Sequence, residues 1–236
     1  MERRQFDRFA DEYMALHARN IAVTGEPPEY FHEYKIRYLQ KILDDKGYPS
    51  GNLRILDFGT GVGNSVPFFR KYFRDCELVC TDVSERSLEV ARRRFGNCAS
   101  YVLFEGQTLP FRSKSFDLAF TACVFHHIPA VEHVGLLHEI HRVLVPGGHL
   151  FLYEHNPLNP LTVRAVRTCE FDDDAILIRS SVMRERLRRA GYSRTSVRYC
   201  VFFPKFLRSL RILEPWLASV AIGTQYCVVG TVTDQG

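Results

Sequence analysis

Asp57-Phe58-Gly59-Thr60-Gly61-Val62-Gly63 is the stretch that decides how this chain folds; it follows the short apolar run of residues 53–56 and precedes a helical pattern. These patterns predict a strand that ends in a carboxylate and continues into a glycine loop. Glycines let the backbone turn with positive φ and let a ligand lie against bare main chain, while the next helix presents unpaired N–H groups. We therefore expect the loop to bind a nucleotide-like ligand.

The residues around the glycines narrow the kind of ligand. Dinucleotide loops carry the pattern G-x-G-x-x-G, whose third glycine lets the helix pack close to the strand. Gly59 and Gly61 fit this pattern, but Asn64 stands at the third position and the additional glycine is Gly63. Asp57 places a negative charge at the mouth of the loop, which disfavours a pyrophosphate and suits an ammonium group. The glycine pattern by itself also fits a purely structural turn.

Strands and helices alternate beyond the loop. The pattern predicts a helix over residues 65–74, with Pro67 in its first turn, and a strand over residues 77–82. That strand ends in Asp82, and an acid at this position of a βαβ unit can accept both hydroxyls of a ribose. Ser84 is the expected cap of the next helix. Further strands are expected at residues 115–123, 149–154, 195–203 and 225–231.

Taken together, these motifs resemble the class I S-adenosylmethionine-dependent methyltransferases, in the small-molecule branch that includes the quinone methyltransferases. The resemblance is strong over residues 50–155 and looser over residues 180–232. It depends on the order and spacing of several features: Asp57 with its three glycines, Asp82, Glu105 before Leu109-Pro110-Phe111, Phe116-Asp117, and Arg142-Val143-Leu144 before Pro146-Gly147-Gly148.

The resemblance implies an α/β fold. It predicts a Rossmann-like seven-stranded sheet with the strand order 3-2-1-4-5-7-6, an antiparallel last strand and helices on both faces. It also predicts a single domain with four parts. These are an N-terminal helical lid (1–49), a cofactor-binding core (50–155), an insertion over the active site (156–180), and a C-terminal helix with an antiparallel strand pair (181–236).

The resemblance further implies S-adenosylmethionine as cofactor and S-adenosylhomocysteine as its product. Asp57 and the glycine loop would hold the methionine part, while Asp82 would bind the ribose hydroxyls. Glu105 stands where the family usually has Asp and would accept from the adenine amino group. The complete set of expected cofactor residues is Asp57, Gly59, Gly61, Gly63, Asp82, Val83, Glu105, Gly106, Ala122, Cys123 and, in the lid, Tyr13.

Length and composition fit one domain with one core: the chain has 236 residues, of which 46% are hydrophobic and 25% charged. The net charge of +4 comes from scattered basic residues, so we expect no nucleic-acid partner. The seven cysteines form no C-x-x-C pair and suit a reducing compartment. Neither a signal-peptide pattern nor a membrane-length apolar run is found, so we expect a cytoplasmic protein.

Segments outside the core are expected to select the substrate. An aromatic helix is predicted over residues 30–43, and Tyr34 within it is a candidate substrate contact, although aromatic residues at this spacing also fit plain helix packing. His126 and His127 follow the fourth strand, in the crevice where open α/β sheets bind ligands. We expect His126 on the substrate side and His127 to take a proton from the acceptor, while a structural role for His127 remains open.

The tip of the fifth strand carries Glu154-His155-Asn156 and leads into the insertion. We expect Glu154 and His155 to be catalytic and Asn156 to contact the substrate; Asn156 would alternatively cap a helix that begins at Pro157. The histidines, with Asp172 to Asp174, offer possible metal ligands. We nevertheless expect no metal, because the acidic ligands of metal-dependent methyltransferases occur at positions that this sequence does not match.

The sequence thus predicts an enzyme that moves a methyl group to an oxygen, nitrogen or carbon atom of a small molecule. A non-catalytic cofactor-binding subunit and an enzyme of the same fold with a non-methylating reaction remain alternatives. Residues 204–217 have an apolar face beside basic residues. We expect a crossover helix packed on the sheet, with contact to an anionic membrane or an amphiphilic acceptor as the alternative. The sequence does not define the oligomeric state.

Overall fold

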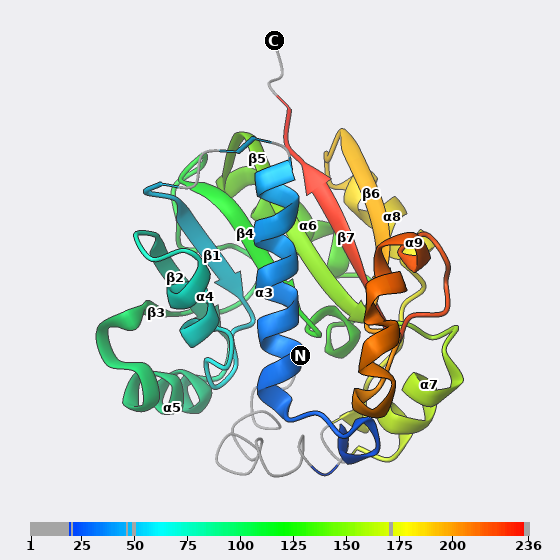
Figure 1. Cartoon of the computed structure of the whole chain (residues 1–236). Coiled ribbons are helices and arrows are strands. Elements are labelled where there is room, and N and C mark those ends of the chain that lie inside the picture. The colour runs from blue at the N-terminus through cyan, green and yellow to red at the C-terminus, as the bar shows by residue number, and fades with distance from the viewer. Residues whose placement is uncertain (1–18, 20, 46, 49–50, 170–171, 234–236) are drawn as a thin grey trace.

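The computed structural model describes residues 19, 21–45, 47–48, 51–169 and 172–233. One seven-stranded sheet organises this part of the chain, in the order β3-β2-β1-β4-β5-β7-β6 (Figure 1). The strands are β1 Arg54–Phe58, β2 Glu77–Asp82, β3 Ser100–Leu103, β4 Phe116–Ala122, β5 Leu144–His155, β6 Arg194–Cys200 and β7 Gln225–Thr231. Because β7 runs antiparallel to both β5 and β6 while β1 to β5 are parallel, the predicted order and direction are confirmed.

Helices cover both faces of the sheet (Figure 1). Helices α3 and α4 contribute to one apolar cluster, and α6 and α8 contribute to the cluster on the opposite face. The helices, with the short 3-10 helices labelled η, are η1 Ala22–Thr24, α3 Pro28–Asp45, α4 Val66–Tyr72, α5 Glu85–Phe95, η2 Gly96–Cys98, η3 Phe125–His127, α6 His133–Val143, α7 Pro160–Arg167, α8 Ser180–Arg189, η5 Lys205–Leu213 and α9 Glu214–Leu217.

Strand β1 shows how the local sequence produces these two layers. Side chains alternate between the faces of a strand, so Ile55 lies in the cluster of α3 and α4, and Leu56 lies in the cluster of α6. Both side chains are fully buried, as expected for a strand with parallel neighbours on both sides. Asp57, the next residue, aligns with Cys80 on β2 and Phe120 on β4, so the centre of the sheet fixes its position.

Two local helix signals read from the sequence are confirmed. Pro67 lies in the first turn of α4, where its missing N–H costs no hydrogen bond. Ser84 caps α5, because its Oγ accepts a 3.0 Å hydrogen bond from the backbone N–H of Ser87. These two helices fix the loops that follow β1 and β2, at the carboxyl edge of the sheet.

Helix α3 confirms the predicted aromatic helix. Ile36 and Leu39 are fully buried in the cluster shared with α4, so this helix packs along the face of the sheet (Figure 1). Tyr13 and the first eighteen residues of the expected lid lie outside the described residues, and the division of the chain into lid, core, insertion and C-terminal part remains a prediction. Within the described part of the chain, no helix is both long and apolar enough to cross a membrane.

The prediction of a packed crossover helix at residues 204–217 is wrong. The segment forms the 3-10 helix η5, interrupted at Leu207, and the one-turn helix α9, and neither has a buried residue. Phe206 is 78% exposed and Trp216 is 72% exposed. The physical reason is the topology: β6 and β7 are antiparallel neighbours, so their connection can remain at one edge instead of crossing a face of the sheet.

Candidate functional site

A cavity of about 570 Å³ opens where the glycine loop meets the carboxyl ends of β2 and β4. This is the position at which open parallel sheets bind ligands, because the loops after neighbouring strands diverge there. The structure brings together at its wall most of the expected cofactor residues: Asp57, Gly59, Gly61, Asp82, Val83, Glu105, Gly106, Ala122 and Cys123.

Asp57 is a buried carboxylate at this wall. Burial raises its pKa to about 7, opposed by a hydrogen bond from Thr60 and reinforced by the charge of Asp82. The Thr60 hydroxyl donates to Asp57 Oδ2 at 2.8 Å. Among the described residues, no lysine, arginine or histidine forms an ion pair with Asp57. A buried carboxylate in this situation favours a cationic ligand, because a cation compensates the cost of desolvating its charge.

Asp82 connects the glycine loop to the end of β2. Its Oδ2 accepts from the backbone N–H of Gly61 at 2.8 Å, and its Oδ1 accepts from the backbone N–H of Ser84 at 2.9 Å. Each carboxylate oxygen can accept more than one hydrogen bond. The Asp82 carboxylate can therefore hold the loop and also accept from ligand hydroxyls at the cavity wall.

The three loop glycines all have positive φ, but the space around them differs from one position to the next. A side chain on Gly59 would place its Cβ 2.4 Å from Val124 Cγ2, whereas a Cβ on Gly61 would meet no atom within 4 Å. Gly63 does not line the cavity. A Cβ there would lie 3.0 Å from the Cβ of Ala91 and 3.1 Å from the ring of Phe95, so Gly63 allows α5 to approach the loop. The predicted cofactor role of Gly63 thus has no support in this geometry.

Several cavity residues were missed by the sequence reasoning. Thr60 lies within the quoted loop, where its hydrogen bond to Asp57 depends on the folded turn. His32 reaches the cavity from α3, and Phe104 follows β3. Their positions depend on how distant elements pack, and an isolated aromatic residue in a helix or loop carries no signal of this kind. The missed cavity residues also include Asn64, Ser65, Gln107, Val124, Ile128, Glu132 and Leu136.

Cys123 follows β4 and has a φ of +59°, which is uncommon for a residue with a side chain. Its backbone N–H donates to the carbonyl oxygen of Tyr153 at 2.8 Å, which ties the strand end to β5. Burial raises the pKa of its thiol, but the charges of His155 and Lys35 outweigh burial and leave the pKa below its ordinary value. His155 pairs with this thiol and does not line the cavity.

Glu154 is hydrogen-bonded to η3 and does not line the cavity. Its Oε1 accepts from the backbone N–H of Phe125 at 2.8 Å and of Val124 at 3.2 Å, and its Oε2 lies 2.6 Å from His126 Nδ1. Burial raises the pKa of Glu154, but the charge of His126 and the hydrogen bonds it receives leave the pKa below its ordinary value. We therefore interpret Glu154 as a positioning residue, in place of the predicted catalytic role.

Glu154→Gln should destabilise the protein by about 1–3 kcal/mol, because the amide keeps only one accepting oxygen and loses the charge that pairs with His126. Urea unfolding at pH 7 measures the change. The matched control is Glu185→Gln, which alters an exposed pair with Arg188 at 3.7 Å and should change stability by less than about 0.5 kcal/mol. Equal effects of the two substitutions would contradict the positioning role.

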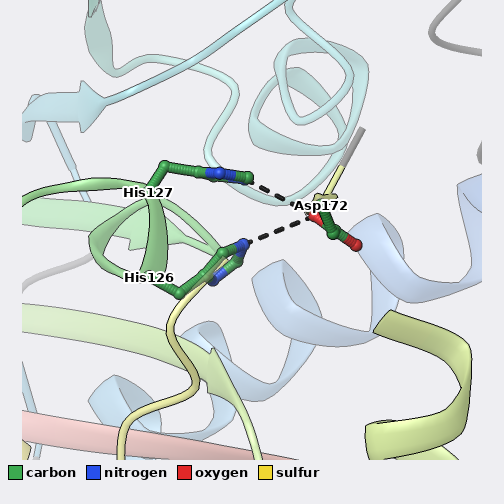
Figure 2. Close-up of side chains that lie close together, drawn as sticks. All are labelled: His126, His127 and Asp172. Atoms are coloured by element: carbon green, nitrogen blue, oxygen red, sulfur yellow. Dashed lines mark ion pairs between the residues drawn. The ribbon is translucent and has the colours of Figure 1, made fainter. Parts of the chain in front are cut away.

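His126 and His127 point from η3 toward Asp172 of the insertion (Figure 2). Of the two, His127 lines the cavity, and its Nδ1 lies 2.9 Å from Asp174 Oδ1. His126 is buried and does not line the cavity. Burial lowers the pKa of His126, but Glu154 and Asp172 raise it well above its ordinary value. The structure thus brings His127, but not His155 or Glu154, to the cavity wall.

Asn156 and Tyr34 lie away from the cavity, so the geometry does not support their predicted substrate contacts. The Asn156 amide donates to the carbonyl oxygens of Ala221 and Gly223, and its Oδ1 accepts from the backbone N–H of Leu158. The Tyr34 hydroxyl donates to Glu214 Oε2 at 3.1 Å.

The alternative of an Asn156 helix cap is also wrong. Helix α7 begins later, at Pro160, and its cap is Asn159, whose Oδ1 accepts from the backbone N–H groups of Leu161 and Thr162. The Asn156 Nδ2 group instead donates to the connection between α9 and β7, and its Oδ1 accepts from the residue 158 backbone, so the amide has partners for both its nitrogen and its oxygen.

Residues 56–152 match a protein family described as Methyltransferase domain. The chain is 30% identical over 140 residues to a biotin biosynthesis bifunctional protein of Cellvibrio japonicus, which covers 58% of this chain and 26% of the relative. It is 32% identical over 131 residues to the sterol 24-C-methyltransferase of Candida albicans, with coverages of 53% and 34%. It is also 32% identical over 107 residues to the demethylmenaquinone methyltransferase of Deinococcus radiodurans, covering 44% of each chain. The chain spans less than half the length of these relatives.

Solved structures share the whole architecture. An S-adenosylmethionine-dependent methyltransferase from Thermotoga maritima superimposes with a TM-score of 0.68 at 19% identity, over 97% of this chain and 98% of that chain. A phosphoethanolamine N-methyltransferase of Haemonchus contortus, solved with S-adenosylmethionine, gives a TM-score of 0.65 at 17% identity, over 97% and 60% of the two chains. At these identities the comparison establishes a common fold. The match shows a methyltransferase domain over residues 56–152, and the strand order and the acidic strand ends beside the glycine loop are those of the class I S-adenosylmethionine-dependent methyltransferases.

Proposed function

We propose that the protein transfers a methyl group from S-adenosylmethionine to an oxygen, nitrogen or carbon atom of a small molecule. The observation that carries this proposal is the buried Asp57 carboxylate at the wall of the cavity, next to a loop whose Gly61 has no side chain to fill the space. A buried carboxylate suits the ammonium group of an amino-acid ligand, and the bare backbone of the loop suits its close approach.

The remaining wall fits the other parts of this cofactor. Asp82, at the tip of β2, would accept from the ribose hydroxyls, and Val83 with Phe104 would pack against the adenine ring. Glu105 and Gly106 also line the cavity, and the Glu105 carboxylate and the Gly106 amide would bind the polar edge of adenine. When bound, the cofactor supplies a methyl group on a sulfonium, which is a good leaving group. The protein contributes by placing the acceptor in line and by excluding water.

The acceptor should have an apolar body and should react beside His127. His127 is the predicted catalytic residue that lines the cavity, and the wall also carries Val124, Ile128 and Leu136. The names of the similar sterol and demethylmenaquinone methyltransferases support an apolar acceptor. For a hydroxyl or amine acceptor, His127 would take the proton, while Asp174 fixes the orientation of its ring.

Incubation with methyl-labelled S-adenosylmethionine and a cell extract tests this function. We expect label in a small molecule that partitions into an organic solvent, and none with Asp57→Asn as the matched protein control. If the protein binds S-adenosylhomocysteine but never releases a labelled product, a non-catalytic cofactor-binding subunit is the better account. A new product that lacks the label would instead indicate a non-methylating reaction on the same fold.

A further inference from the structure

Three side chains with metal-binding atoms converge beside the cavity from distant parts of the sequence. Asp172 Oδ1 lies 3.6 Å from His126 Nε2 and 3.5 Å from His127 Nε2 (Figure 2). The three atoms all lie within 4.8 Å of one another. A tetrahedral zinc ion about 2.0–2.1 Å from its donors sets neighbouring donors about 3.4 Å apart. The two distances to Asp172 are therefore close to those of a formed site.

Both imidazoles are oriented so that Nε2 faces Asp172. His126 Nδ1 lies 2.6 Å from Glu154 Oε2, and His127 Nδ1 lies 2.9 Å from Asp174 Oδ1. A carboxylate that accepts from Nδ1–H leaves the lone pair of the imidazole on Nε2. Metal-bound histidines typically have such an outer carboxylate, which fixes the ring and raises its basicity.

The backbone around Asp172 is held against η3. The N–H of Ile176 donates to the carbonyl oxygen of His126 at 2.8 Å, and the N–H of Ala175 donates to that of Asp172 at 2.9 Å. The N–H of Asp172 donates to the carbonyl oxygen of Cys169 at 3.0 Å. These bonds place Asp172 beside the histidines independently of the contact between the side chains.

Burial and charge also favour a cation at this position. The side chains of His126, His127 and Asp172 are at most 10% exposed, and Glu154 is equally buried. Imidazoles that bind a metal are neutral, so the cluster around a bound ion contains the negative charges of Glu154, Asp172 and Asp174. A dication between the two Nε2 atoms and Asp172 would compensate most of this charge where water cannot.

We propose that His126, His127 and Asp172 bind a transition-metal dication of the Zn²⁺ type, through the two Nε2 atoms and one carboxylate oxygen. Two imidazole donors favour such an ion over Mg²⁺ or Ca²⁺, which take oxygen ligands. Three protein ligands leave a coordination position for water or substrate, as in catalytic zinc sites. This proposal differs from the sequence prediction of no metal, because only the fold brings Asp172 to the histidines.

Because His127 lines the cavity, an ion bound to it would lie close to the acceptor. An ion there would polarise an acceptor hydroxyl and favour release of its proton to water, leaving an oxygen that takes the methyl group. His127 Nε2 would hold the ion, and the ion would replace His127 as the group that activates the acceptor. This use of the site rests on the proposed function, whereas metal binding itself does not.

Equilibrium dialysis of the chelator-treated full chain against Zn²⁺ or Mg²⁺ tests the site. All proteins carry Cys98→Ser, so that this exposed thiol does not compete. We expect one Zn²⁺ per chain, and we expect Asp172→Asn to weaken its affinity by about 100-fold or more. Asp173→Asn makes the same chemical change at the adjacent exposed residue and should leave the affinity unchanged. Equal affinities of these two variants, or Mg²⁺ bound as tightly as Zn²⁺, would overturn the proposal.

A second measurement separates this site from the cofactor site. Co²⁺ bound by imidazole and carboxylate ligands should give a visible absorption band that both Asp172→Asn and His127→Gln abolish. Circular dichroism checks that each variant is folded, and if one variant unfolds, the other carries the test. Asp172 does not line the cofactor cavity, so Asp172→Asn should still bind S-adenosylhomocysteine with the affinity of the unmodified chain, and loss of metal alone leaves the methyltransferase proposal intact. Retention of the Co²⁺ band in a folded variant would refute the ligand assignment.

Discussion

Gly59→Ala should destabilise the protein by about 2–5 kcal/mol, a large part of the stability of a typical domain. Alanine at a φ of +74° costs about 1–2 kcal/mol. Its Cβ would also lie 2.4 and 2.8 Å from the two methyl carbons of Val124, and overpacking of this kind costs about 1–3 kcal/mol. Val124 cannot easily turn away, because a β-branched side chain has few χ1 rotamers and Glu154 holds its backbone N–H. Urea unfolding followed by circular dichroism measures the loss.

Gly61→Ala is the matched control for this substitution. Gly61 also has a positive φ, but a Cβ there meets no atom within 4 Å. We expect this variant to lose only about 1–2 kcal/mol of stability, while its methyl group enters the cavity and weakens S-adenosylhomocysteine binding in calorimetry. In a double-mutant cycle, Val124→Ala should recover the overpacking part of the Gly59→Ala loss. A Gly59→Ala protein as stable as Gly61→Ala would show that the contact with Val124 is easily relieved.

Asp57→Asn should weaken cofactor binding by about two to three orders of magnitude while it stabilises the unliganded protein. Removing one partner of a buried charged contact costs about 2–5 kcal/mol of binding free energy. The affinity of the unmodified protein for S-adenosylhomocysteine should fall by up to about tenfold per unit as the pH drops below 7, because the Asp57 carboxyl is then protonated. The variant should show no such dependence between pH 5.5 and 7, and calorimetry over roughly this range measures both.

The sign of the stability effect follows from the same pKa. Folding raises the pKa of Asp57 from 3.8 to about 7, so the fold favours the neutral carboxyl and disfavours the ionised one. Its contribution to stability is present at low pH and is lost as the pH rises from about 4 through 7. Asp57→Asn should therefore exceed the unmodified protein in stability by on the order of 2–4 kcal/mol at pH 8, and match it near pH 4.

The opposite directions of these two effects make the Asp57 prediction specific. A residue with only a structural role would lose stability when it is replaced, and would lose binding as a consequence. Thermal unfolding of the unliganded proteins at pH 4, 6 and 8 gives the stability difference. A variant that is less stable at pH 8 and still binds S-adenosylhomocysteine normally would refute the cofactor role of Asp57.

The positions read correctly from the sequence are those that local chain geometry fixes. Asp57 and Asp82 end parallel strands, and the glycines between them need positive φ, so their place at the carboxyl edge follows from the strand pattern. Gly63 belongs to the same loop but does not line the cavity. Its conformation is local, but its contacts with Ala91 and Phe95 depend on the packing of α5.

The sequence pattern does not predict the direction in which individual side chains point. Glu154, His155 and Asn156 are consecutive at the end of β5, yet they contact η3, Cys123 and the 221–223 connection, respectively. Alternation along a strand sends neighbouring side chains to opposite faces, and which face carries the cavity depends on the packed layers. Tyr34 is a similar case, because its hydroxyl reaches Glu214, a residue far along the chain.

The sequence by itself determined the strand pattern, the glycine loop and the acidic residues at two strand ends, because hydrophobic periodicity and glycine conformation act over a few residues. The fold and the cofactor class came from the family resemblance that these motifs carry. The tertiary structure alone decided which polar groups meet. His126 and His127 face Asp172 because η3 rests on Glu154 and because the insertion is hydrogen-bonded to the carbonyl oxygen of His126. These contacts join three separate parts of the chain, and no local pattern encodes the distance between them.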